Sequence, residues 1–339
     1  MTIGCDDSYV DRVTQALPVI VVLGSTSDDR PAHLTPLDGR VELRYTDAAG
    51  LGDALDGARG LLLWDYFSEA IKSVWDRSDS LEWIHVAAAG VDKLMFDDLR
   101  RSDVVVTNAH GVFDLPIAEF VLASVLARAK LVHESHDLQL ARTWHRRETL
   151  PVAGATALVV GTGGIGRAIA RLLRAVGMNV AGAGRTPAAD DPDFGRVVDS
   201  SRLVDHVGEF DYVVNATPLT PETTGLFEAK VFAAMGPGSY FINIGRGASV
   251  VEADLADAVQ RQEISGAALD VFEQEPLPVD SPLWTLPGVV VSAHMAGDVL
   301  GWKDSLARQF VDIAEHWLEG TPMPNVVDKQ RGYVPGRSL

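Results

Sequence analysis

Residues 156–177 read TALVVGTGGIGRAIARLLRAVG, and this stretch decides the fold class of the chain. A short apolar run, TALVV, leads directly into Gly161, Gly163 and Gly166, and a helical pattern follows. Strand, glycine-rich turn and helix in this order are typical of the first half of a dinucleotide-binding βαβ unit. The stretch therefore predicts a nucleotide-binding turn, with a glycine-rich turn that binds no nucleotide as the alternative.

Each glycine of the turn has an expected task. Gly161 permits the tight turn, Gly163 lets the backbone approach a pyrophosphate, and Gly166 allows the helix to pack closely on the strand. The amide groups at the start of the helix, around Gly164 and Ile165, would face the phosphates.

The next apolar run, MNVAGAG, indicates which dinucleotide is bound. An acidic residue that hydrogen-bonds the ribose of NAD usually ends this strand, about 20 residues after the glycines. Here Gly184 takes that place, followed at once by Arg185 and Thr186. A guanidinium pairs with a 2′-phosphate, and a hydroxyl can add a hydrogen bond. NADP(H) is therefore favoured and NAD(H) is possible; the alternative is that Arg185 stacks on the adenine or faces solvent.

Short apolar runs alternate with helical patterns on both sides of this stretch. The runs before it are LPVIVVLG, VELRYT, GLLLWDY, LEWIHVA and DVVVTNA, and those after it are MNVAGAG, DYVVNAT, SYFINIG, ISGAALDVF and GVVVSAH. Such alternation is typical of parallel sheets built from βαβ units. We expect an α/β protein with two doubly wound, parallel-sheet, Rossmann-like domains.

Two longer helical patterns indicate how the domains connect. Residues 115–138 form one continuous pattern, which would bridge two domains or bury a face in a dimer. The last pattern, residues 299–320, ends at Gly320 with prolines beyond. If that helix returns to the first domain, a dinucleotide-binding domain (112–298) is inserted into a flavodoxin-like substrate-binding domain (1–111 plus 299–339). Residues 108–113 and 296–301 would then be the hinges.

Composition limits the partners of the chain. Its 339 residues carry 29 Lys+Arg against 47 Asp+Glu, a formal net charge of −18, which disfavours attraction to nucleic acid or an anionic membrane. The single cysteine, Cys5, excludes an internal disulfide and a cysteine-based zinc cluster. The acidic start lacks a signal-peptide pattern, and no apolar run approaches the ~20 residues that span a bilayer. We expect a cytoplasmic protein without nucleic-acid, membrane or metal partners.

Three polar residues in the last third stand in apolar or glycine-rich settings: Arg246, Glu275 and His294. Arg246 follows the run SYFINIG and His294 ends the run GVVVSAH, and ligands of open α/β sheets bind beyond the carboxyl ends of strands. A cation can bind an anionic substrate, an imidazole can move a proton, and a carboxylate can set that imidazole's charge. The triplet predicts carbonyl chemistry on an anion, although each residue alone also fits a surface charge or a core histidine.

Several segments, taken in order, resemble the D-isomer-specific 2-hydroxyacid dehydrogenases, a family that includes glyoxylate/hydroxypyruvate reductases and phosphoglycerate dehydrogenase. The segments are VTNAHGVFDLPIAEFVLASVLA, GTGGIGRAIA, NATPLTPETTGLF, FINIGRGASVVEADL, ALDVFEQEPLP and SAHMAG, and NVVDKQRGY is similar to the tail of some members. The resemblance covers nearly the whole chain after the first strand. It implies an oxidoreductase that converts a small 2-oxo acid to the D-2-hydroxy acid by hydride transfer from NAD(P)H.

The resemblance also implies roles for matching positions. Arg246 would bind the substrate carboxylate and carbonyl oxygen, and His294 would be the general acid in reduction. Glu275 would hydrogen-bond His294 and favour its imidazolium form, because a nearby negative charge stabilises the protonated ring. Backbone amides at Ala89 and Gly90 would bind the substrate carboxylate. The positions expected to bind the cofactor are Gly161, Gly163, Gly164, Ile165, Gly166, Arg185, Thr186, Thr217, Pro218, Thr223, Ile244, Asp270 and Gly297.

Several residues keep two interpretations. Trp64, Tyr66 and Phe67 follow a strand and would either wall the substrate side of the cleft or belong to the core. Trp144 matches a tryptophan that reaches the partner subunit's site in related glyoxylate reductases, or it packs in an ordinary dimer interface. His133 and His136 have a spacing that a metal could use, but an exposed helix face is the simpler explanation because no third ligand is evident.

A homodimer is expected, and two other functions remain as alternatives on the same fold. One is a nonenzymatic, corepressor-like sensor of NAD(P), and the other is a formate- or phosphite-type dehydrogenase.

Overall fold

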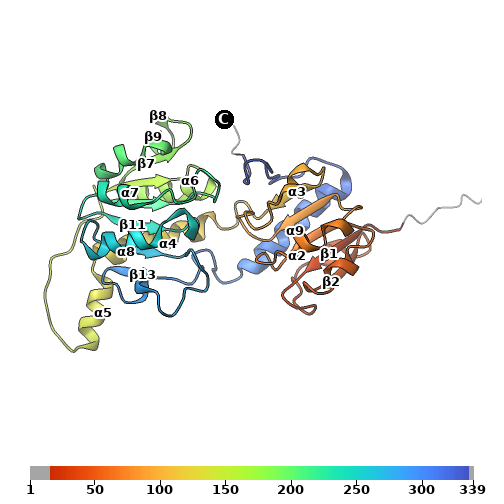
Figure 1. Ribbon diagram of the computed structural model, residues 1–339, viewed down its shortest axis with the longest axis horizontal. Helices are drawn as coiled ribbons and strands as arrows, with labels where there is room; N and C mark the ends of the chain where they lie inside the picture. The colour runs from red at the N-terminus through yellow and green to blue at the C-terminus, as the bar shows by residue number, and fades with distance from the viewer. Residues whose placement is uncertain (1–15, 336–339) are drawn as a thin grey trace, which may run out of the picture.

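The chain folds around two separate sheets, which lie side by side in the computed structural model (Figure 1). The structure describes residues 16–335. Cys5 and the acidic start of the chain, on which the expectations about thiols and targeting depend, lie outside this range.

The first sheet has five parallel strands in the order β2-β1-β3-β4-β5. This is the flavodoxin-like order, with the strand order reversing between β1 and β3. Its strands are β1 (Val19–Leu23), β2 (Glu42–Thr46), β3 (Ala58–Leu63), β4 (Trp83–Val86) and β5 (Val105–Asn108), and the short helices between them are α1 (Leu51–Ala54), α2 (Ala70–Ser73) and α3 (Asp97–Arg101).

The last helix, α9 (Trp302–Glu319), covers one face of this first sheet. Leu306, Phe310 and Ile313 of α9 are buried in one cluster with Ile20 and Trp83 of the sheet. The rings of Trp83 and Phe310 stack with their centroids 5.4 Å apart. The chain therefore returns to its first sheet after building the second one.

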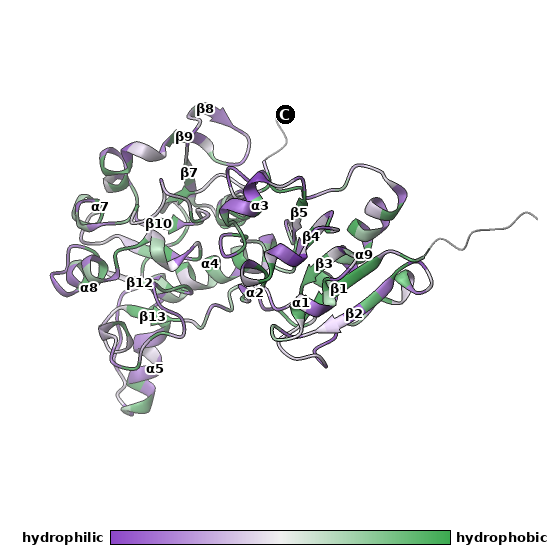
Figure 2. Cartoon of the chain, turned by 45° about the vertical axis from the view of Figure 1, so that its right-hand side comes forward, coloured by the Kyte–Doolittle hydropathy of each residue, from purple (hydrophilic) through white to green (hydrophobic). Residues whose placement is uncertain are grey.

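The second sheet has eight strands in the order β13-β12-β11-β10-β6-β7-β9-β8. Its strands are β6 (Thr156–Val160), β7 (Asn179–Gly184), β8 (Ala188–Asp191), β9 (Gly195–Asp199), β10 (Tyr212–Asn215), β11 (Tyr240–Asn243), β12 (Gly266–Leu269) and β13 (Val289–Val291). Helices α4 (Asp114–Ala129) and α6 (Gly164–Ala175) cover one face, and α7 (Ala229–Ala234) and α8 (Glu252–Gln260) cover the other. Figure 2 shows apolar strands inside both sheets and polar residues on the outer helices. The predicted α/β class with two parallel, Rossmann-like sheets is confirmed.

Short 3-10 helices complete the chain: η1 (Thr35–Leu37), η2 (Trp75–Arg77), η3 (Ser200–Asp205), η4 (Val207–Glu209), η5 (Gly247–Ser249) and η6 (Pro282–Trp284). Among the described helices, none is both long and apolar enough to cross a membrane.

One edge of the second sheet differs from the prediction of parallel strands. Strand β8 pairs with β9 in the antiparallel direction. The sequence of β8, AADD, has no apolar alternation that would mark a strand. The hairpin is instead held by ion pairs from α6, because Arg167 binds Asp191 at 3.0 Å and Arg171 binds Asp193 at 2.6 Å.

The single helix predicted over residues 115–138 is wrong, because the chain breaks there into α4 and α5 (Val132–Leu140). Leu131 between them has the left-handed φ of 53°. The returning chain explains the break, since the amide of Leu150 donates to the carbonyl oxygen of Ala129 (3.0 Å) and Lys130 Nζ donates to the carbonyl oxygen of Leu150 (2.7 Å). These bonds take up a helix-end carbonyl that a longer helix would need. Helix α5 then extends away from the sheet (Figure 1).

The two chain connections between the sheets touch each other. A Cβ placed on Gly297 would lie 2.6 Å from the ring of Phe113, so the two segments approach closely only because residue 297 is glycine. Gln309 of α9 donates to the carbonyl oxygen of His110 at 2.9 Å. The domain limits at 111/112 and 298/299, and the hinges there, stay predictions.

Candidate active site

The predicted site residues gather at the carboxyl ends of the strands of the second sheet. The glycine-rich turn follows β6, Arg185 follows β7, Thr217 follows β10, Arg246 follows β11, Asp270 follows β12, and His294 follows β13. Parallel strands bring these ends to one edge, where open α/β sheets bind their ligands.

The glycine-rich turn fits a dinucleotide pyrophosphate. Gly161 has a φ of 110°, which a residue with a side chain rarely adopts. A Cβ on Gly166 would lie 1.9 Å from the carbonyl oxygen of Gly161, whereas a Cβ on Gly163 would meet no atom within 4 Å among the described residues. Helix α6 begins at Gly164, directly after this open position, so its amide groups face the space where phosphates would bind.

Two groups beside this turn were not assigned to the site from the sequence. A Cβ on Gly164 would lie 2.5 Å from Oδ2 of Asp114 and 3.2 Å from Cε1 of His110. Burial raises the pKa of Asp114, against the lowering effect of His110 and Arg171. Asp114 is the first residue of α4. It lies about 50 residues before the glycine-rich turn in the sequence, and the two come together only in the folded chain.

The end of β7 explains why the usual acidic residue is missing. A Cβ on Gly184 would lie 2.9 Å from Oγ1 of Thr162 in the glycine-rich turn, so a larger residue would collide with that turn. Arg185 and Thr186 follow as exposed residues. Arg185 is thus placed to meet a ligand that leaves the turn, and it also contacts Tyr333 near the end of the described chain.

A buried polar network links the ends of β10 and β11. Asn215 Nδ2 donates to Oδ1 of Asn243 (2.9 Å) and to Oγ of Ser249 (2.7 Å), while Oγ1 of Thr217 donates to Oδ1 of Asn215 (2.8 Å). Ser249 in turn donates to the carbonyl oxygen of Arg246 at 2.5 Å. The network couples the loop that starts at Thr217 to the backbone of Arg246. Its sequence signal is a polar residue that ends each apolar strand, YVVN and YFIN.

The remaining positions expected at the cofactor lie along the same edge. Thr223 closes the loop after Thr217 by donating to the carbonyl oxygen of Pro218 at 2.6 Å. Ile244 is buried directly after β11.

Arg246 reaches from the second sheet to the loop after β4 of the first. Its Nε donates to Oδ1 of Asp92 at 2.9 Å, and its Nη1 donates to the carbonyl oxygen of Gly245 at 2.8 Å. A Cβ on Gly90 would lie only 1.4 Å from Nη2, so the loop carrying Ala89 and Gly90 packs directly on the guanidinium. Asp92 was not predicted as a site residue, although it lies two residues after Gly90.

His294 and Glu275 form a pair, with Nδ1 2.7 Å from Oε2. Burial raises the pKa of Glu275, but hydrogen bonds from His294 and from the amide of Phe272 outweigh burial, so the pKa lies below its ordinary value. An ionised Glu275 can only accept, and the proton therefore sits on Nδ1 of His294. This leaves Nε2 as the ring nitrogen that can exchange a proton with a ligand.

Hydrogen bonds to Asp270 fix the loop that carries His294. His294 has a φ of 52°, a conformation that is unfavourable for a residue with a side chain and persists only where its surroundings impose it. Its amide donates to the carbonyl oxygen of Asp270 at 2.8 Å. The Asp270 carboxylate accepts from Ser292 Oγ (2.6 Å) and from the amides of Met295 (2.9 Å) and Ala296 (3.0 Å). Asp270, one of the positions expected to bind the cofactor, is 3% exposed and anchors this loop.

The three aromatic residues with two interpretations separate in the structure. Trp64 is buried in the core of the first domain, and Tyr66 packs partly against that core. Phe67 is 46% exposed, and its ring centroid lies 5.8 Å from that of His294. Lys93 Nζ also lies near this ring, 4.7 Å from its centroid. Phe67 is therefore the aromatic residue of the three that borders the His294 side chain.

The helix α5 and the chain that follows it stand apart from this site. His133 and His136 are exposed on α5, and Trp144 is 95% exposed. Between residues 16 and 335, no three His, Cys, Asp or Glu side chains are grouped so that they could hold a metal ion.

Comparisons with known proteins agree with this geometry. The family model for the NAD binding domain of the D-isomer specific 2-hydroxyacid dehydrogenases matches residues 122–296. The chain is 32% identical over 253 residues to the (S)-sulfolactate dehydrogenase of Chromohalobacter salexigens, covering 74% of this chain and 82% of that protein. It is 34% identical over 219 residues to glyoxylate/hydroxypyruvate reductase A of Serratia proteamaculans, covering 63% of this chain and 68% of that protein.

A solved structure extends the similarity to the whole architecture. The NADPH-dependent glyoxylate/hydroxypyruvate reductase of Sinorhizobium meliloti, in complex with NADP and sulfate, superposes with a TM-score of 0.81 at 28% identity, over 94% of this chain and 100% of that one. A family match over half of the chain, relatives above 30% identity and a shared two-domain fold point to one family and one class of reaction. The chain belongs to the D-isomer-specific 2-hydroxyacid dehydrogenases and is an NAD(P)-dependent oxidoreductase acting on CH–OH donors.

Proposed function

We propose that this enzyme reduces a small 2-oxo acid, of the glyoxylate or hydroxypyruvate type, to the D-2-hydroxy acid with NADPH. The observation that carries the proposal is the His294–Glu275 pair, 2.7 Å apart, at the same strand ends as a guanidinium that reaches the Gly90 loop. The names of two similar proteins, both glyoxylate/hydroxypyruvate reductases, support this choice of substrate.

Each side chain of the site has a defined task in this proposal. Arg246 and the amides at Ala89 and Gly90 bind the substrate carboxylate, and the guanidinium also stabilises negative charge on the carbonyl oxygen. Nε2 of His294 gives its proton to that oxygen, while Glu275 holds Nδ1 and balances the imidazolium charge. A bound nicotinamide supplies the hydride. Phe67, beside His294, excludes water from one side of the ring.

NADPH is proposed as the cofactor because of the residues at the end of β7. Gly184 stands where NAD enzymes usually carry a carboxylate, and an exposed cation and a hydroxyl, Arg185 and Thr186, follow it directly. The glycine-rich turn and the start of α6 would hold the pyrophosphate. The solved relative that contains NADP supports the same preference.

Loss of NADPH absorbance with a panel of 2-oxo acids tests the proposal. Glyoxylate, hydroxypyruvate, pyruvate and bulkier 2-oxo acids are compared with NADPH and with NADH, and formate and phosphite are tested in the oxidative direction. We expect the highest kcat/KM with a small 2-oxo acid and NADPH. Turnover of formate or phosphite alone, or a preference for NADH, would overturn the substrate or the cofactor assignment respectively.

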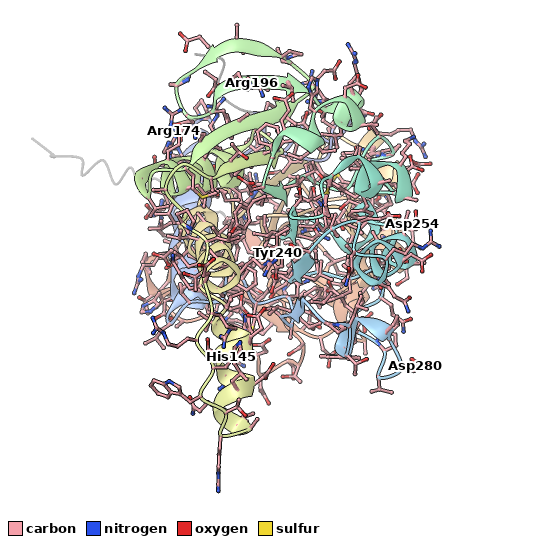
Figure 3. The ribbon with its side chains drawn as sticks, turned by 90° about the vertical axis from the view of Figure 1, so that its left-hand side faces the viewer. His145, Arg174, Arg196, Tyr240, Asp254 and Asp280 are labelled. Atoms are coloured by element: carbon pink, nitrogen blue, oxygen red, sulfur yellow. The ribbon has the colours of Figure 1, made fainter. Side chains whose placement is uncertain are left out.

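We also propose that the enzyme is a homodimer, because the described part of the chain leaves helix α5 uncovered. None of the nine residues of this described helix is buried, and an isolated helix of this length is marginal in water. Leu140, Trp144 and Leu150 expose apolar side chains on this arm, residues 130–150, which Figure 3 shows projecting below the body with His145 labelled. A second copy of the chain would bury them.

Light scattering after size exclusion tests the dimer with Trp144→Ser and Leu140→Ser together. We expect a dimer for the wild type and a monomer, or a concentration-dependent mixture, for the double variant. Two Ser substitutions at Val204 and Val279, exposed apolar residues away from the arm, are the control and leave the dimer unchanged. A wild-type monomer at micromolar concentration would contradict the proposal.

A further inference from the structure

The C-terminal segment, residues 325–335, is fixed to the first sheet. The amide of Val327 donates to the carbonyl oxygen of Val106 on β5 at 2.8 Å, and Val327 is buried. Lys329 Nζ donates to the carbonyl oxygens of Ser102 (2.5 Å) and Val104 (2.9 Å). These contacts anchor the segment to the substrate-binding side of the molecule.

A tight turn then sets the position of Tyr333. The amide of Asp328 donates to the carbonyl oxygen of Tyr333 at 3.0 Å, and the amide of Gly332 donates back to Asp328 at 2.7 Å. Oδ1 of Asp328 accepts from the amides of Gln330 (3.0 Å) and Arg331 (3.1 Å). Because these hydrogen bonds to Asp328 close the turn, they fix the backbone position of Tyr333.

Tyr333 contacts the second domain at Arg185. The guanidinium carbon of Arg185 lies 5.2 Å from the Tyr333 ring centroid, and Nη2 of Arg185 donates to the Tyr333 hydroxyl. Figure 1 shows the segment, in dark blue, near the gap between the two sheets. The residue proposed to recognise the 2′-phosphate of NADP is therefore touched by a side chain from the other domain.

The chemistry of the phenol fits a phosphate at this point. In the contact with Arg185 the Tyr333 oxygen accepts, so its own proton is free to donate to a second acceptor. A phosphate oxygen beside a guanidinium is such an acceptor, and hydrogen bonds to charged groups are the strong ones. The exposed carboxylate of Glu222, whose pKa Arg185 helps to lower, cannot serve as a donor to phosphate when ionised.

We propose that Tyr333 is part of the cofactor site: its hydroxyl donates to the adenosine 2′-phosphate, and its ring covers the guanidinium of Arg185. The inference rests on the proposed use of NADPH. NADP would then be held by both domains, whereas NAD, with a hydroxyl in place of the phosphate, would bind the second domain alone at this end.

Equilibrium binding of fragments without a nicotinamide tests the inference apart from turnover. Calorimetry compares adenosine 2′,5′-bisphosphate with 5′-AMP on the wild type, Tyr333→Phe, Arg185→Ala and the control Tyr45→Phe, a first-domain tyrosine that packs under Arg30. We expect Tyr333→Phe to weaken the bisphosphate roughly 10- to 100-fold, as loss of a hydrogen bond to a charged group does, and to leave 5′-AMP within about twofold. Arg185→Ala should weaken the bisphosphate more, and Tyr45→Phe should change neither.

The outcomes separate the inference from the proposed function. If Arg185→Ala weakens the bisphosphate and Tyr333→Phe does not, the role of Tyr333 is overturned and the NADPH assignment stands. If Arg185→Ala has no effect, or the wild type does not prefer the bisphosphate, the NADPH assignment fails and the inference fails with it. Equal weakening of both fragments by Tyr333→Phe would assign the residue to adenine or ribose instead, and would also overturn the inference.

Discussion

Asp92 accepts a hydrogen bond from Nε of Arg246 at 2.9 Å, and the two residues lie in loops that follow strands of different sheets. Nη1 is bonded to the carbonyl oxygen of Gly245, so Nη2, packed on Gly90, is the nitrogen left toward the loop expected to bind the substrate. Asp92 thus sets the orientation in which Arg246 would receive a carboxylate.

Asp92→Asn should raise KM for the 2-oxo acid by about tenfold and change kcat less, because an amide holds the guanidinium more weakly than a carboxylate does. Steady-state kinetics at saturating NADPH measure the effect. Asp98→Asn, which removes the exposed partner of Arg101 on α3, is the control and should leave both constants unchanged. An unchanged KM in Asp92→Asn would remove Asp92 from substrate binding.

Gly90→Ala should nearly abolish turnover while the protein stays folded. The new Cβ would occupy a position 1.4 Å from Nη2 of Arg246, so the guanidinium must leave its place. Gly163→Ala provides a comparison, because a Cβ there would meet no atom within 4 Å among the described residues. Gly111→Ala is unsuitable for this purpose, because Gly111 has a positive φ of 89°. Circular dichroism confirms folding, and full activity of Gly90→Ala would show that Arg246 is not required in its present place.

His294→Ala should lower turnover roughly 100- to 10,000-fold, which is the usual contribution of general acid catalysis. NADPH binding, measured by nucleotide fluorescence, should stay within about twofold, because the proposed role of His294 is proton transfer to the substrate. Glu275→Gln should retain part of the activity. A fully active His294→Ala enzyme would exclude the imidazole from the reaction.

The Glu275–His294 pair also gives a direction for pH dependence. The pKa of Glu275 is lowered in the folded state, so the ionised carboxylate adds stability above its unfolded pKa, and this contribution is lost as the pH falls through the folded pKa. Wild type should therefore lose stability on acidification over that range more steeply than Glu275→Gln does. Thermal unfolding between about pH 3 and 6 measures it, and parallel curves would contradict the ion pair.

A second titrating group, His85, should destabilise the fold in mild acid. It is fully buried on β4, with Nδ1 2.9 Å from Oγ1 of Thr107, and burial lowers its pKa from 6.5 to about 3. Below pH 6.5 the His85 side chain is therefore protonated in the unfolded chain but stays neutral in the folded chain. The free energy of unfolding falls as the pH drops below the His85 pKa of the unfolded chain. At pH 5 the loss is about 2 kcal/mol.

Urea unfolding at pH 7.5 and pH 5 measures this loss in the wild type and in His85→Gln. The amide keeps an acceptor for the Thr107 hydroxyl but does not titrate, so the variant should lose about 2 kcal/mol less between the two conditions. The same pH dependence in both proteins would show that His85 is not the group responsible.

The sequence predicted those features that depend on neighbours along the chain. A strand that runs into a glycine turn, or that ends at a polar residue, is a local pattern, and the strands before Gly161, Arg246 and His294 form as expected. The residues that the sequence did not assign to the site, Asp92 and Tyr333, contact predicted residues that are far away in the chain. Asp92 and Arg246 lie 154 positions apart, and Arg185 and Tyr333 lie 148 positions apart. Such pairs follow from the arrangement of the two sheets rather than from any segment's own pattern.

The wrong predictions have the same origin. The helical pattern of residues 115–138 continues past Ala129, but a hydrogen bond from Leu150 ends the helix there. The antiparallel strand β8 has no pattern of its own. Ion pairs from Arg167 and Arg171 on α6 to Asp191 and Asp193 hold the hairpin of β8 and β9 in place. In both places, tertiary contacts override local propensity.

The contact between Gly297 and Phe113 has a consequence for movement. Because the two connections between the sheets meet at Gly297 and Phe113, a bend in one connection would be transmitted directly to the other. A methyl group at residue 297 would collide with the Phe113 ring and push the two connections apart.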